Sequence, residues 1–138
     1  MVVLDRNSII SEKPLRQTAE AVKIWNDLAP SGSWISTMAA MHSLELIANR
    51  DLSRYGARYP YFNPSILSDS RVPKEVKAFL REGYEADVSH SYVALDLVER
   101  HAGNGDVEEI QYAYLRSAGA FSDYLEARLE RGVMLGNK

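Results

Sequence analysis

Residues 106–131, which read DVEEIQYAYLRSAGAFSDYLEARLER, carry the clearest structural pattern in this chain. Large apolar side chains recur along this stretch with near-heptad spacing, at Val107, Ile110, Tyr114, Phe121 and Leu125. That period is typical of a helix with one face turned towards a core. Asp106 followed by Glu109 is an acidic variant of the capping box, and Gly132 is a favourable C-terminal cap. The pattern therefore predicts a helix from Asp106 to just before Gly132.

A second long helix is predicted immediately upstream. It opens at Pro73, continues to about His101 and is stopped by the turn Gly103-Asn104-Gly105. Because the turn is short, we expect the two long helices to pair as an antiparallel hairpin. Gly83 lies inside the upstream helix, where it predicts a bend or a close helix approach.

Two shorter helices precede this pair. The first opens at Ser11–Pro14 and runs to about residue 28, and the second begins near Ser33 or Ser36 and runs to about residue 54. The residues that share the predicted inner face are mostly large and apolar. They are Leu15, Thr18, Val22, Trp25 and Leu28 on the first helix, and Trp34, Met38, Met41, Ala48 and Leu52 on the second. No stretch alternates with a period of two for more than a few residues. The sequence therefore predicts an all-α fold, a helical bundle of four main helices.

Between the second and third helices lies a long aromatic-rich connection, residues 56–72, which contains Pro60 and Pro64. Exposure of its aromatic and aliphatic side chains to water would be unfavourable, so we expect the connection to pack across one end of the bundle. Residues 1–10 form an N-terminal arm whose apolar side chains are available to dock. A length of 138 residues predicts one helical domain over 1–138.

Composition excludes several classes of protein. The chain has no cysteine, which rules out disulfide scaffolds, cysteine-bound zinc, iron–sulfur clusters and cysteine nucleophiles. The N-terminus does not resemble a signal peptide, and no run is long and apolar enough for a membrane span. We therefore expect a soluble, cytoplasmic protein. A net charge of −3 with dispersed bases argues against nucleic-acid binding.

Three polar residues fall on faces that should be apolar. Glu45 lies among the apolar residues of the second helix, and Asp87 and His90 lie on the inner face of the third. A spacing of three residues makes Asp87 and His90 neighbours on that helix. Because burial of an unpaired carboxylate is energetically costly, we expect these residues either to pair with one another or to form a binding site.

Three explanations of the cluster stay open. It is a structural ion pair, in which Glu45 or Asp87 meets His90 or Arg128. It is a site in the bundle core for a small molecule or a metal, with the acids and the histidine as ligands or as general acid and base. Or the helix register is assigned a few residues off. The pattern of ferritin-like di-iron bundles is incomplete here: Asp87-x-x-His90 is present, His42-x-x-Glu45 has the reversed order, and the first helix offers no acid on its inner face.

Eight tyrosines are more than a small domain requires, and exposed aromatic residues enrich interfaces. The candidate interface consists of Tyr59, Tyr61, Phe62, Tyr84, Tyr92 and Tyr112. With no nucleotide-binding or hydrolase motif present, the favoured hypothesis is a protein-interaction module that pairs with itself as a homodimer or with a protein partner. The alternative is the core site built from Glu45, Asp87 and His90. The sequence names no cofactor and leaves open whether the chain is an enzyme.

Overall fold

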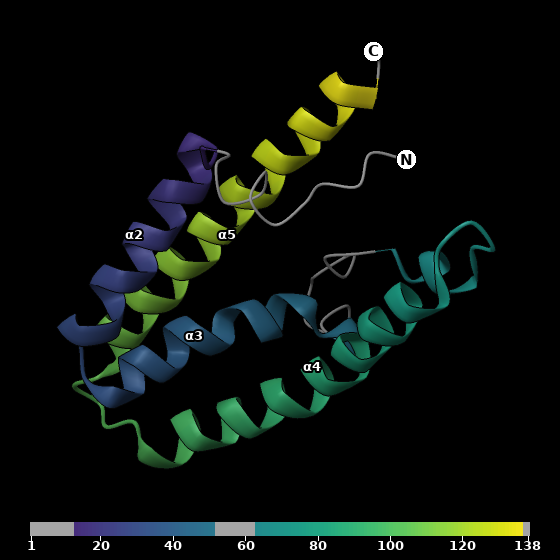
Figure 1. Cartoon of the computed structure of the whole chain (residues 1–138). Coiled ribbons are helices and arrows are strands. Elements are labelled where there is room, and N and C mark those ends of the chain that lie inside the picture. Colours follow the sequence, from purple (N-terminus) through teal and green to yellow (C-terminus); the bar gives the residue numbers. More distant parts are fainter. Residues whose placement is uncertain (1–12, 52–62, 137–138) are drawn as a thin grey trace.

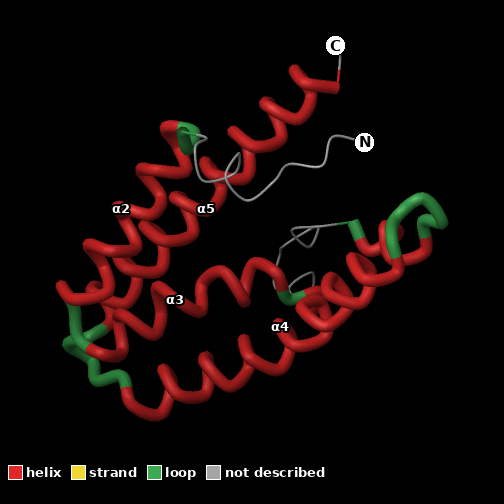
Figure 2. Tube along the Cα trace, in the orientation of Figure 1, coloured by secondary structure: helices red, strands yellow, loops and turns green. Residues whose placement is uncertain are grey.

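The computed structural model describes residues 13–51 and 63–136, and within these ranges every regular element is helical. The α-helices are α2 (Arg16–Ser31), α3 (Trp34–Ala48), α4 (Lys74–His101) and α5 (Val107–Gly136), and a short 3-10 helix, η2 (Pro64–Ser68), precedes α4. Figure 2 shows helices and loops but no strand in the described part of the chain. The predicted all-α class with four main helices is confirmed. The predicted arm, residues 1–10, lies outside the described residues.

The helix α3 lies at the centre of the arrangement. It packs against both α4 and α5, while α2 lies along α5 (Figure 1). The two long helices, α4 and α5, diverge from the short turn that joins them, so the predicted hairpin between them was wrong. A short connection permits antiparallel pairing, but here α3 occupies the space between the two helices.

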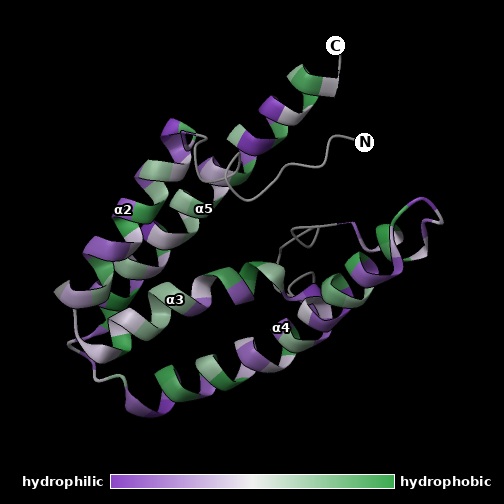
Figure 3. Ribbon diagram, viewed as in Figure 1, coloured by the Kyte–Doolittle hydropathy of each residue, from purple (hydrophilic) through white to green (hydrophobic). Residues whose placement is uncertain are grey.

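Small residues form the helix contacts. The buried apolar residues are almost all alanine: Ala21, Ile35, Ala39, Ala40, Ala48, Ala94, Ala113, Ala120 and Ala127. Because alanine and serine let helix backbones approach closely, the faces that carry them turn inward and many larger side chains are left outside. In Figure 3, hydrophobic segments recur along the whole of α4 and α5, including the end of α5 that projects beyond α2.

The inner faces predicted from large residues need correction for this reason. Trp34 and Met41 are 57% and 65% exposed, and Val22 is 47% exposed. On α3 the predicted Ala48 is buried, and the other buried positions are Ile35, Ser36, Ala39, Ala40 and Ser43. Hydrophobicity runs nearly all around this helix, so its pattern cannot identify the side that contacts its neighbours.

Gly83 does not interrupt α4, which is continuous from Lys74 to His101. The helix α3 ends earlier than predicted, at Ala48, where the backbone N–H of Asn49 donates to the carbonyl oxygens of Glu45 and Leu46. Among the helices that the structure describes, none has the length and hydrophobicity needed to cross a membrane.

The N-terminus of α3 is held by a carboxylate from α5. Glu109 Oε1 accepts hydrogen bonds of 2.7 Å from the Ser33 backbone N–H and from the Ser36 hydroxyl. Gly32 makes room for this contact, because a Cβ there would collide with Ser36 Oγ and come within 2.7 Å of Glu109 Oε1. The hydrogen bond from the Ser33 backbone lowers the pKa of Glu109 below its usual range, and the Ser36 hydroxyl lowers it further.

We expect Glu109→Gln to lower the melting temperature at pH 7. A carboxyl group whose pKa is depressed in the folded state contributes stability above its unfolded pKa, near 4.5, and loses it as the pH falls through the folded value. The stability difference between native protein and variant should therefore shrink below about pH 4.5. Thermal unfolding between pH 3 and 7 measures it.

Glu108→Gln is the matched control, because it removes the same charge from the same helix turn at an exposed position. Equal effects of the two substitutions across this pH range would show that the contact with Ser33 and Ser36 contributes nothing specific.

Candidate functional site

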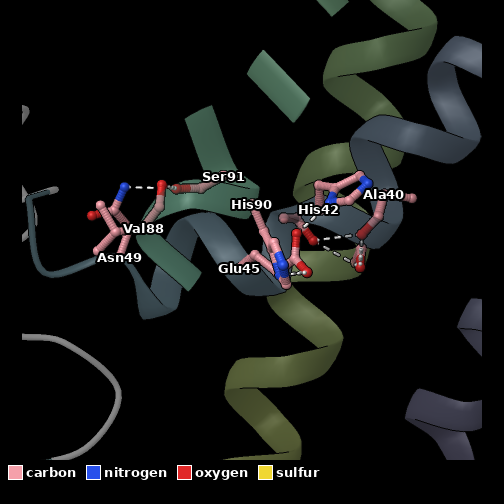
Figure 4. A network of polar contacts seen from close by, with 9 residues as sticks. Ala40, His42, Glu45, Asn49, Val88, His90 and Ser91 are labelled. Carbon is pink, nitrogen blue, oxygen red and sulfur yellow. Dashed lines mark hydrogen bonds and ion pairs between the residues drawn. The ribbon is translucent and has the colours of Figure 1, made fainter. Parts of the chain in front are cut away.

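The structure brings Glu45 and His90 together across α3 and α4, as the sequence pattern suggested. Glu45 Oε1 lies 3.2 Å from His90 Nδ1. The second carboxylate oxygen, Oε2, contacts Nδ1 of His42 one helical turn earlier on α3. Glu45 thus bridges two histidines, and Figure 4 shows its side chain between them. His42 was not among the predicted site residues.

Asp87 lies beside this group without a hydrogen bond to it. Burial raises the pKa of Asp87, the nearby charge of Glu45 raises it further, and His90 acts in the opposite direction. Arg128, the other partner considered from the sequence, lies elsewhere: its guanidinium donates to the Tyr124 hydroxyl at 2.6 Å and sits 5.3 Å from the Tyr124 ring centroid. Glu45 therefore interacts with two histidines rather than with Arg128.

The metal-binding alternative finds no support in residues 13–51 and 63–136. No group of three or more histidine, aspartate or glutamate side chains in these ranges is arranged to hold a metal ion. The assignment of Glu45, Asp87 and His90 as ligands for a metal or a small molecule stays a prediction.

A large apolar pocket lies next to the histidine pair. Its volume is about 760 Å³, and α3, α4 and α5 all contribute to its wall. The apolar lining consists of Met38, Ala39 and Leu46, of Ala94, Leu95 and Val98, and of Ile110 and Leu115. The polar residues in the lining are His42, Gln111 and Tyr114. An apolar cavity of this size with a few polar groups is typical of small-molecule sites.

His42 connects the pocket with the charged group behind it. Its Nδ1 is engaged by the Glu45 carboxylate, which favours the tautomer with the proton on Nδ1. The lone pair then lies on Nε2, where an imidazole can accept a proton from a bound molecule or from water. Tyr114 is the second titratable group of the lining, and burial raises the pKa of its phenol, which keeps the hydroxyl protonated.

Buried hydroxyl groups fix α3 at this position. The hydroxyls of Ser43 and Ser117 lie 2.9 Å apart, and each lies 2.7 Å from the Ala40 carbonyl oxygen. The indole N–H of Trp25 donates to Ser117 Oγ at 3.1 Å, so that α2, α3 and α5 meet at one point. On the other side, Asn49 donates to Ser91 of α4 at 2.6 Å. These bonds determine which face of α3 turns towards the pocket.

The predicted tyrosine interface is distributed over separate elements. Tyr84 and Tyr92 lie on α4 near the end of α3, where Arg50 stacks on the Tyr84 ring and the Tyr92 hydroxyl lies 3.4 Å from Asp51. Tyr112 lies on α5 and is 64% exposed. Tyr59, Tyr61 and Phe62 lie outside the described residues. The role of these aromatics as an interface stays a prediction.

The pocket and its polar groups were not predictable from the sequence. The spacing of His42 and Glu45, three residues apart on a helix, was the one available indication that the histidine meets the acid. For Gln111 and Tyr114 the sequence contained no such indication, because the spacing of apolar residues along α5 does not show that a cavity lies beside them.

A model of the TENA/THI-4/PQQC family matches residues 3–131 of the chain. The family comprises enzymes of thiamine salvage, described as thiaminase II, or of PQQ synthesis, and its proteins commonly oligomerise. No curated protein matches the chain.

This match overturns the favoured functional hypothesis. The prediction of a protein-interaction module was wrong, because the family consists of enzymes that bind and convert small molecules. The sequence has no local catalytic motif, because the candidate groups come from three different helices.

Proposed function

Because the chain belongs to the TENA/THI-4/PQQC family, we propose that it is an enzyme that binds a small ring compound in the pocket between α3, α4 and α5. One observation carries the proposal: His42 is at once part of the pocket lining and hydrogen-bonded to Glu45. That arrangement provides an oriented base beside an apolar cavity, which is what acid–base chemistry on a bound molecule requires.

The charge of the pocket favours a thiamine-type cationic ring as ligand. Thiamine carries a permanent positive charge, whereas pyrroloquinoline quinone carries several carboxylates. Among the described residues that line the pocket there is no lysine or arginine, and the carboxylate of Glu45 lies behind His42. A polyanion would therefore enter the pocket without a counter-charge, while a cation would be attracted by Glu45.

The chemistry proposed is hydrolysis with His42 as general base. His42 Nε2 takes a proton from water, the water oxygen attacks the carbon that links the two rings, and the bond from this carbon to the positively charged nitrogen breaks. The nitrogen keeps the electron pair, so the leaving ring becomes neutral and the proton stays on His42. A covalent step through cysteine is excluded, because the chain has none.

Two further parts of the proposal concern the state of the protein. We propose that the enzyme assembles as a homodimer, in keeping with a family whose members commonly oligomerise. The cytoplasmic location expected from the sequence stays a prediction.

Substitutions at the pocket mouth test the ligand. Leu115 lines the pocket and is 67% exposed, so Leu115→Lys should place a positive charge at the mouth without disturbing the core. We expect it to weaken thiamine binding about tenfold by charge repulsion, while Leu115→Glu preserves or strengthens binding. Isothermal titration calorimetry with thiamine and with pyrroloquinoline quinone measures both.

Leu129→Lys is the control, because Leu129 lies on the same helix, is 69% exposed and does not line the pocket. Equal weakening by lysine and glutamate at position 115 would show that the ligand is not cationic. Tighter binding of the quinone than of thiamine would overturn the proposed substrate class.

A further inference from the structure

A second apolar stripe runs along α4 beside the face that Ser91 and Ala94 bury. We call this stripe the α4 seam. It consists of Phe79, Gly83, Ala86, Val93 and Leu97 together with His90, its one polar member, whose ring contacts Glu45 of α3. The spacing alternates between four and three residues, as at the contact positions of paired helices. Phe79 is 76% exposed and Val93 is 57% exposed, so the described part of the chain leaves large side chains of the seam in solvent.

Small residues of the seam leave a hollow next to a large one. A cavity of about 270 Å³ is lined by Phe79, Leu80, Glu82, Gly83 and Ala86. A Cβ added at Gly83 would meet no atom within 4 Å. The seam thus offers both a protruding side chain and space for another one, the combination that a self-complementary contact requires.

We propose that a second copy of this chain packs its own α4 antiparallel against the α4 seam, about a two-fold axis near the middle of the helix. Phe79 and Leu97 are equally distant from position 88, which nearly coincides with the centre of α4 (Lys74–His101). Full overlap of the two helices therefore places Phe79 opposite Leu97 of the second copy. The same register places Gly83 opposite Val93 of the second copy and Ala86 opposite its His90.

The charges at the helix ends complement one another in this register. Glu75 lies in the first turn of α4 and Arg100 in the last, so antiparallel overlap brings each glutamate to the arginine of the other copy. Glu82 comes to lie near Asp96 of the other copy, whose carboxylate is already paired with Arg100. Opposed helix dipoles favour the same orientation.

The size of the contact indicates a reversible dimer. A helix of 28 residues is about 42 Å long, and a stripe roughly 10 Å wide along it gives a contact on the order of 1,000 Å² in total. That area is near the lower limit for specific interfaces. The inference rests on the homodimer of the proposed function and is independent of the pocket and its ligand.

Sedimentation velocity over a range of concentrations tests the surface. We expect the native chain to dimerise as concentration rises, and Phe79→Lys to raise the dimer dissociation constant about tenfold or more. Leu129→Lys, which places the same charge on exposed α5, should leave the dissociation constant unchanged. A monomer at every concentration would overturn the dimer and the surface together, whereas a dimer unaffected by Phe79→Lys would overturn the surface alone.

The absence of cysteine allows the register to be tested separately. Ser89 is exposed on the flank of the seam, next to the proposed two-fold axis, so Ser89→Cys places the two thiols of a dimer across that axis. We expect a short bis-maleimide to cross-link this variant into a covalent dimer. Ser122→Cys, exposed on α5, should not be cross-linked under the same conditions. Equal cross-linking of the two variants would overturn the proposed register.

Discussion

Ser117→Leu should abolish stable folding or reduce the free energy of unfolding by about 3–5 kcal/mol. Ser117 is completely buried where α2, α3 and α5 meet, and its hydroxyl contacts Ser43, the Ala40 carbonyl and the Trp25 indole. A leucine there has no space, and it leaves the indole N–H of Trp25 without its hydrogen-bond partner. The loss is a large share of the stability of an ordinary domain.

Urea unfolding followed by circular dichroism measures this effect. Ser122→Leu makes the same change at an exposed position on the same helix and should alter stability by less than about 0.5 kcal/mol. Ser117→Ala separates the two causes, since it removes the hydrogen bonds without adding volume and should cost about 1–3 kcal/mol. Similar stabilities of Ser117→Leu and Ser122→Leu would show that the helix junction is not closely packed.

The largest effect on activity is expected at His42. His42→Gln removes the base that lines the pocket, so the proposed hydrolysis of thiamine should slow by about 10²–10⁴-fold in kcat, with little change in KM. His90→Gln should have a smaller effect, because the His90 side chain is 57% exposed and does not line the pocket. The rate of product formation, measured by chromatography, compares both variants with the native enzyme.

The same pair of variants shows which histidine acts on the substrate. If His90→Gln impairs turnover more than His42→Gln, the chemistry takes place outside the pocket and the assignment of His42 as base is wrong. Thermal unfolding of both variants shows whether a loss of activity reflects a loss of structure.

The presence of the main helices could be predicted from the local pattern of residues along the chain. The long helices could be identified because apolar residues recur with a helical period and because Gly103-Asn104-Gly105 stops one helix before the next. Ser33 was a sound cap signal, and its side chain does accept from the Ser36 backbone N–H. Each of these features depends on residues within a few positions of one another.

The contact faces were not predictable in the same way. Large side chains such as Trp34 and Met41 were assigned to the interior, whereas the interior is occupied by alanine and serine. Close approach of helices is stabilised by small residues on both partners at once, and no single helix reveals that property. The proximity of Glu45 and His90 was suggested correctly, because a misplaced carboxylate needs a partner wherever the helices lie.

The sequence by itself determined the helical class, the turns between helices and the exclusion of cysteine chemistry, because these follow from local propensity and composition. Only the tertiary structure decided that α3 separates α4 from α5 and that His42 joins Glu45 at the wall of a pocket. The reason is physical: a cavity exists only between elements, and its shape depends on how closely several helices approach one another.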